Sequence, residues 1–238
     1  MTLFNSTFCK PRWLRKDEFP SSPELIEEIE KWLIFMKERH NNQLEKLKPR
    51  LNAERHKRDE ALDEIFSAYL MENIFGYPIL QWDAKTINNR DVDFIIYNEG
   101  EIYCEVKSPG WESELGSKDI SNKRKLLPKH INGETRTLGG IRGIRYSIEK
   151  SYQKFLPNCR NLLIIKDDFF SPILDNIRRI DIALFHPEKG CFFDNRFENL
   201  GGIIFLNLRK LIRIDSFEYR YKFVKNNNSK VPFSLLNH

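Results

Sequence analysis

The stretch DVDFIIYNEGEIYCEVK, which runs from Asp91 to Lys107, decides the fold that we expect for this chain. It contains two mostly apolar runs, 91–97 and 101–107, and each has the length of a β-strand. Between them stands Asn-Glu-Gly at 98–100, a composition typical of tight turns. The pattern therefore predicts a β-hairpin.

Charged residues recur on one face of this expected hairpin. Side chains along a strand point alternately to the two faces of a sheet, so the apolar residues of both runs can pack on one core. The opposite face then carries Asp91, Asp93, Glu105 and Lys107. If the runs pair around the turn, Asp93 and Glu105 lie roughly opposite each other. Asp91 could serve as a further metal ligand or stand solvated at the strand end.

These residue types in this arrangement favour metal-dependent chemistry. Two neighbouring carboxylates raise each other's pKa unless a cation neutralises them. Mg²⁺ commonly takes one or two carboxylates and keeps several waters, and the backbone carbonyl of Val106 could add an oxygen. Lys107 could orient or deprotonate a water, or neutralise charge that builds on a phosphate. The pattern thus indicates a phosphodiester hydrolase site, and the alternative is a surface hairpin with solvated charges. The similar triplet Asp83-Ala84-Lys85 lacks a preceding strand that contains an aspartate.

The rest of the chain alternates between helical and extended patterns. Apolar residues at helical spacing predict helices over about 21–36, 52–73 and 141–156, and a short helix near 173–178. Further strands are expected at 77–82, 161–168, 180–186, 201–208 and 217–224. The segment 37–60 is dense in charge and contains Pro49, so we expect a solvated helical hairpin there. Alternating helices and strands from residue 60 onward predict an α/β core.

Composition narrows the class of protein. The 238 residues carry a formal net charge of +5, which is compatible with a polyanionic partner and equally with none. The cysteines form no CxxC pair and the histidines no HxxxH spacing, so we expect neither a zinc site nor a disulfide framework. The N-terminus lacks an apolar signal sequence, and the chain has no run of about 18 apolar residues. We therefore expect a cytoplasmic protein without a transmembrane helix.

The motif D-x11-E-V-K, formed by Asp93, Glu105, Val106 and Lys107, resembles that of the PD-(D/E)XK nuclease superfamily. Many restriction endonucleases and the resolvase- and RecB-like nuclease domains share its fold. The resemblance covers about residues 60–170, and Val92 stands where the superfamily usually has proline. It implies a restriction-endonuclease-like core, with a central mixed β-sheet flanked by helices. We expect residues 1–57 to form an N-terminal helical extension and residues 58–238 the nuclease-like domain.

The resemblance also implies an activity and further site residues. Asp93 and Glu105 would bind Mg²⁺ or Mn²⁺, and the chain would hydrolyse DNA as an endonuclease of restriction, repair or defence type. Members often carry a metal-site glutamate on the first helix, for which Glu64 is the candidate, with Asp63 and Glu60 behind it. Gln153 stands where RecB-like members have a glutamine, or else it is a solvated helix position. Two alternatives are a catalytically silent nucleic-acid-binding protein on the same fold and a protein-interaction domain.

A long polar segment, 108–140, follows the motif and is expected to be a loop. Its basic residues could contact a nucleic-acid backbone: Lys118, Lys123, Arg124, Lys125, Lys129 and Arg136. Basic residues on the next helix could extend that surface or simply be solvated: Arg142, Arg145, Lys150 and Lys154. The N-terminal helical segment is compatible with DNA binding, with a partner contact and with a homodimer.

Overall fold

The structure, a computed structural model, describes residues 23–53, 55–86, 90–107, 133–166, 174, 177–211 and 216–235. Its centre is a six-stranded sheet in the order β1-β2-β3-β4-β5-β6. The strands are β1 (Ile79–Lys85), β2 (Asp91–Tyr97), β3 (Glu101–Lys107), β4 (Arg160–Lys166), β5 (Gly202–Leu211) and β6 (Ser216–Lys225). β1, β2 and β3 pair antiparallel, β3, β4 and β5 pair parallel, and β6 returns antiparallel to β5. The expected mixed sheet is confirmed.

The hairpin of β2 and β3 forms as the sequence predicts. Phe94 pairs with Cys104 and Tyr97 with Glu101 across the two strands. At the turn the Asn98 amide donates to the Gly100 carbonyl at 3.0 Å. Gly100 has a φ of +136°, a backbone conformation that residues with a Cβ rarely adopt. The hairpin therefore brings Asp93 and Glu105 to the next opposed position after Phe94 and Cys104.

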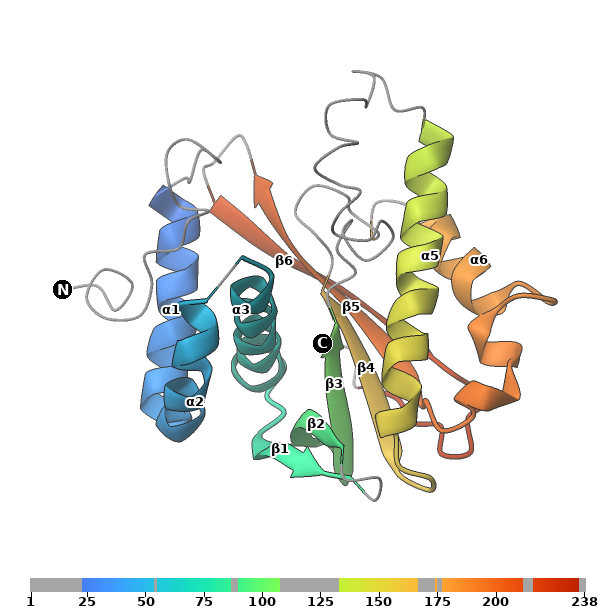
Figure 1. Cartoon of the computed structure of the whole chain (residues 1–238), viewed down its shortest axis with the longest axis horizontal. Helices are drawn as coiled ribbons and strands as arrows, with labels where there is room; N and C mark the ends of the chain where they lie inside the picture. Colours follow the sequence, from blue (N-terminus) through green and yellow to red (C-terminus); the bar gives the residue numbers. More distant parts are fainter. Residues whose placement is uncertain are drawn as a thin grey trace.

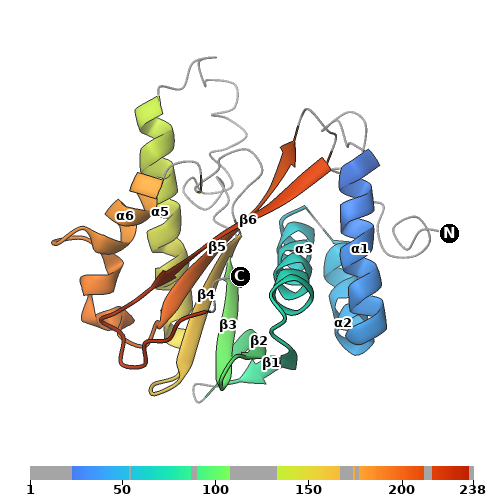
Figure 2. The same ribbon diagram turned by 180° about the vertical axis from the view of Figure 1, so that it is seen from behind.

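Helices cover both faces of the sheet (Figures 1 and 2). On one face lie α1 (Pro23–Arg39), α2 (Asn41–Leu51) and α3 (Arg55–Tyr69), and a π-helical turn, Leu70–Ile74, extends α3. On the other face lie α5 (Gly133–Ser151), which continues as a 3-10 turn (Tyr152–Lys154), and α6 (Ile177–Phe185). Short 3-10 turns, Cys191–Phe193 and Asn195–Phe197, precede β5. This order of a helix, three strands, a helix and a further strand is the one expected above.

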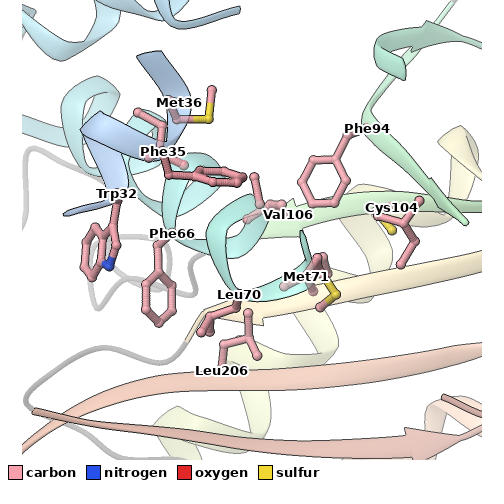
Figure 3. Packing of buried hydrophobic residues seen from close by; sticks show 14 of the residues in the cluster. Trp32, Phe35, Met36, Phe66, Leu70, Met71, Phe94, Cys104, Val106 and Leu206 are labelled. Carbon is pink, nitrogen blue, oxygen red and sulfur yellow. The ribbon is translucent and has the colours of Figure 1, made fainter. Parts of the chain in front are cut away.

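Each face of the sheet has its own apolar core, because side chains of neighbouring positions alternate between the faces. On the α3 side, residues such as Phe66, Phe94 and Leu206 are completely buried or nearly so. Figure 3 shows Trp32 of α1 beside Phe66 of α3, with ring centroids 4.9 Å apart. On the α5 side, Ile144 and Ile148 pack with apolar residues of β4, β5 and α6. These cores hold α3, β3 and α5 in fixed relation around the end of the hairpin.

The N-terminal helices belong to the first of these cores. α2 buries Leu44, Leu47 and Leu51 and is therefore less solvated than its charge density suggests. Pro49 lies inside α2, which ends at Leu51. α1 and α2 share buried contacts with α3 and the sheet. The domain boundary after residue 57 stays a prediction. Within the described ranges, no helix is both long and apolar enough to cross a membrane.

Two expected elements differ from the structure. The strand prediction for 180–186 is wrong, because Ile177–Phe185 forms α6 and buries Ile180, Ala183 and Leu184. A short apolar run fits a strand and a buried helix equally well, and the tertiary position decides between them. α5 begins at Gly133, within the segment expected to be a loop, although glycine is among the weakest helix formers.

Candidate active site

The proposed metal ligands lie where β2 begins and β3 ends. The Asp93 side chain accepts a hydrogen bond through Oδ2 from the Val106 amide at 2.6 Å. Because the amide and carbonyl of a strand residue point toward the same neighbouring strand, the Val106 carbonyl is directed toward β2 as well. Asp93, Glu105 and the Val106 backbone therefore meet at one edge of the sheet, as the parity of the two strands predicts.

Glu105 is completely buried and is paired with two lysines. Its Oε1 atom lies 2.5 Å from Lys107 Nζ and 2.7 Å from Lys154 Nζ. Its Oε2 atom accepts a hydrogen bond from Lys154 Nζ at 2.8 Å. A carboxylate removed from water is tolerated when charged partners satisfy its oxygens. The two ammonium groups therefore explain how Glu105 stays in the protein interior.

The carboxylates of the site act on one another. Burial raises the pKa of Asp93 well above its usual range, and the charges of Glu105 and Glu64 raise it further, against lowering effects from Lys154 and the Val106 amide. Burial likewise raises the pKa of Glu64 to about 7, although Arg50 opposes this effect. The site thus gathers three carboxylates in a poorly solvated place beside Lys107, Lys154 and Arg50, and a bound cation would further favour the charged forms of the carboxylates.

Lys107 keeps its proton. Burial lowers the pKa of an ammonium group, but the carboxylates of Glu105 and Asp93 outweigh that effect at Lys107, and its pKa is raised. Its side chain is 31% exposed, so solvent can reach it. An ammonium group held between carboxylates in this way can orient a water or neutralise charge on a phosphate.

Glu64 is the helix carboxylate with the strongest link to the site. It projects from α3, is largely buried, and lies 2.7 Å from Arg50 Nη1 through Oε1. Its charge raises the pKa of Asp93, and that of Glu105 raises its own. Its neighbour Asp63 instead pairs with Lys166 at 2.6 Å, and Glu60 lies 3.7 Å from Arg50 Nη2. The geometry favours Glu64 over the other two, and its role in metal binding stays a prediction.

The helix after the motif brings Lys154 to the site. Gln153 is exposed and donates to the Tyr152 hydroxyl at 3.3 Å, while the next residue, Lys154, reaches Glu105. α5 ends at Ser151 and continues as a 3-10 turn. In a 3-10 turn, successive side chains are rotated by roughly 20° more per residue than in an α-helix. The spacing of a regular α-helix therefore does not predict which residue after Ser151 faces the sheet. From the sequence, Lys154 was expected only to extend a basic surface or to be solvated. The one sequence feature that could have indicated its role in the site is its place next to Gln153, the expected glutamine position.

The predicted nucleic-acid contacts fall mostly beyond the described residues. Lys118, Lys123, Arg124, Lys125 and Lys129 lie outside the described ranges, and their contacts stay predictions. Arg136 lies in α5, in a part of the helix for which only the backbone is described.

The residues present fit a hard divalent cation that keeps part of its water shell. Asp93 and Glu105 supply carboxylate oxygens, and the Val106 carbonyl, which we expect to point toward β2 like the Val106 amide, could add a third oxygen. Mg²⁺ is commonly bound by one or two carboxylates together with waters, rather than in a cage made only of protein. In the described part of the chain, no three or more His, Cys, Asp or Glu residues form a group that could hold a metal ion. The donor set therefore suits a partly hydrated ion.

Comparison with known proteins identifies no family for this chain and only a weak structural similarity. No protein-family model matches the sequence, and no curated protein matches it. SfsA from Pyrococcus furiosus, solved in complex with Ca²⁺, is similar to the chain with 16% identity and a TM-score of 0.29. The match covers 68% of this chain and 61% of that SfsA chain, so this chain spans about three fifths of its length. A TM-score this low carries no argument about the fold or the function of this chain.

Proposed function

We propose that this chain is a metal-dependent nuclease that hydrolyses phosphodiester bonds in DNA, in a restriction, repair or defence role. The observation that supports it most is the meeting of Asp93, Glu105 and Lys107 at one sheet edge, beside the Val106 backbone. The order of helices and strands around these residues agrees with the PD-(D/E)XK superfamily that the motif resembles.

Each residue of the set has a distinct proposed role. Asp93 and Glu105 would hold Mg²⁺ or Mn²⁺ together with the Val106 carbonyl, and Glu64 of α3 would act on the hydrated ion from further away, without forming a group of three carboxylates. The bound ion would polarise the phosphate and increase the acidity of a bound water. Lys107 would orient or deprotonate the attacking water, or neutralise the charge that develops on the phosphate.

The DNA backbone would be held by the basic segment that follows β3. Lys118, Lys123, Arg124, Lys125, Lys129 and Arg136 would neutralise phosphates without reading sequence. The segment follows Lys107 directly in the sequence, and this is the reason to expect it near the site. A homodimer and a cytoplasmic location remain part of the proposal.

Cleavage of supercoiled plasmid tests the proposal directly. Purified protein is incubated with plasmid in Mg²⁺ or Mn²⁺, beside an EDTA control and a Glu105→Ala variant. We expect nicking or linearisation that EDTA and the substitution both abolish. Cleavage that persists in the variant would show that the activity does not arise from this site.

A catalytically silent nucleic-acid-binding protein is the second candidate, and one observation favours it. Glu105 already has two ammonium partners, and a carboxylate so neutralised has less need of a metal. This candidate predicts DNA binding that does not change with Mn²⁺, together with no cleavage of any plasmid. Calorimetric titration with Mn²⁺ separates the two candidates, because only the nuclease needs the ion.

A further inference from the structure

Lys154 contacts both oxygens of the Glu105 carboxylate. Its ammonium nitrogen lies 2.7 Å from Oε1 and 2.8 Å from Oε2. Lys107, which belongs to the same strand as Glu105, contacts Oε1 at 2.5 Å. Within the described part of the chain, Oε2 accepts a hydrogen bond from Lys154 alone. Oε2 is therefore the oxygen that becomes available when Lys154 moves.

The charge of Lys154 also acts on the other proposed ligand. Burial and the neighbouring carboxylates raise the pKa of Asp93, and the charge of Lys154, like that of Lys107, opposes this rise. One ammonium group thus stabilises two carboxylates on neighbouring strands, β2 and β3. A divalent cation held by Asp93 and Glu105 would act on the same two groups, so the ion and the ammonium compete for one place.

Lys154 is better suited to leave Glu105 than Lys107 is. It lies in a 3-10 turn at the end of α5, and such turns have weaker backbone hydrogen-bond geometry than an α-helix. Its side chain is 25% exposed, and a lysine has a flexible stem of four carbons. Lys107 extends from the β3 backbone two residues after Glu105, and its contact with Oε1 leaves Oε2 to a metal ion.

We propose that Lys154 is a positioning residue that acts as an internal counter-ion for the metal site. It contacts both oxygens of Glu105 and holds the carboxylate in place without metal, and it releases Oε2 when a divalent cation binds. The inference rests on the proposed function, since it takes Asp93 and Glu105 as the metal ligands. It explains how a completely buried carboxylate can be kept ready for a metal ion.

The test is calorimetric titration of the full chain with Mn²⁺, without DNA. Lys154→Met removes the competing charge, and we expect its Kd for Mn²⁺ to fall about tenfold below that of the wild type. Lys154→Arg keeps the charge and should restore the wild-type Kd. Lys189→Met removes one exposed charge after α6, and it should leave the Kd within about twofold. If Lys154→Met does not fold, Lys154→Gln carries the same expectation of tighter binding.

The outcomes separate this inference from the proposed function. A lysine with a merely structural role predicts a lower melting temperature for Lys154→Met with an unchanged or weaker Mn²⁺ affinity, and that result overturns the inference alone. Tighter binding by Lys154→Met that disappears when Glu105→Gln is added supports it. If neither the wild type nor any variant binds Mn²⁺, the proposed function and the inference both fail.

Discussion

Replacing Lys107 with methionine should impair cleavage far more than stability. Lys154 still contacts both oxygens of Glu105 in the variant, so the buried carboxylate is not left unpaired. The variant therefore avoids the loss of about 3–5 kcal/mol of stability that follows when a buried charge is left without a partner. The substitution removes a hydrogen-bonded ion pair between a lysine that is 31% exposed and a completely buried carboxylate, and hydrogen bonds to charged groups contribute about 1.5–3 kcal/mol, with the lower end applying where solvent reaches one partner. We therefore expect the free energy of unfolding to fall by about 1.5 kcal/mol.

The expected effect on chemistry is larger. Removing one group aimed at charge that develops in a transition state lowers the rate roughly 10²–10³-fold, which is about 2.7–4 kcal/mol. Single-turnover cleavage of plasmid in Mg²⁺ measures this decrease, and urea unfolding measures stability. DNA binding, followed by fluorescence anisotropy, should stay close to the wild-type value, because the lysine acts in chemistry rather than as an anchor.

Lys85→Met provides the matched control. Lys85 also follows an acidic residue by two positions and is exposed at the end of β1. We expect this variant to cleave at the wild-type rate. If Lys107→Met cleaves within about threefold of the wild type, the catalytic role assigned to Lys107 is wrong. If its stability instead falls by about 3 kcal/mol or more, Lys154 does not compensate for the missing ammonium group, and the reasoning from the shared carboxylate fails.

Three further predictions address the rest of the site. Asp93→Asn should weaken Mn²⁺ binding because it removes a ligand charge, and an unchanged calorimetric Kd would count against that role. Glu64 has a folded pKa of about 7, raised from its ordinary value of 4.5, so its protonation stabilises the fold at low pH and this contribution disappears as pH rises through about 7. In EDTA, the free energy of unfolding of the wild type should therefore fall more steeply between pH 5 and 8 than that of Glu64→Gln, and identical slopes would refute this. Neutralising Lys123, Arg124 and Lys125 together should reduce the salt slope of DNA binding by about 0.9 for each phosphate that is no longer neutralised, whereas an unchanged slope would mean that they do not touch phosphates.

Some of the site was accessible from local sequence pattern. The two runs around Asn-Glu-Gly form β2 and β3 with the predicted bounds, and Asp93, Glu105 and Lys107 lie at one edge as their parity requires. Glu64 was a weaker prediction, because its position relative to the strands depends on how α3 packs. The wrong strand prediction for 180–186 shows the limit of local pattern, because a short apolar run is compatible with both a strand and a buried helix.

Local sequence pattern was sufficient for the hairpin and for the charged face of its strands, because alternation along a strand is a property of the local backbone. Only the tertiary structure decided which distant groups meet that face. Lys154 reaches Glu105 from 49 residues away, and Arg50 reaches Glu64 from another helix. Both contacts depend on how helices end and pack against the sheet, and a 3-10 turn after Ser151 changes which side chain points inward. The physical reason is that such contacts are set by non-local packing, which no short spacing rule encodes.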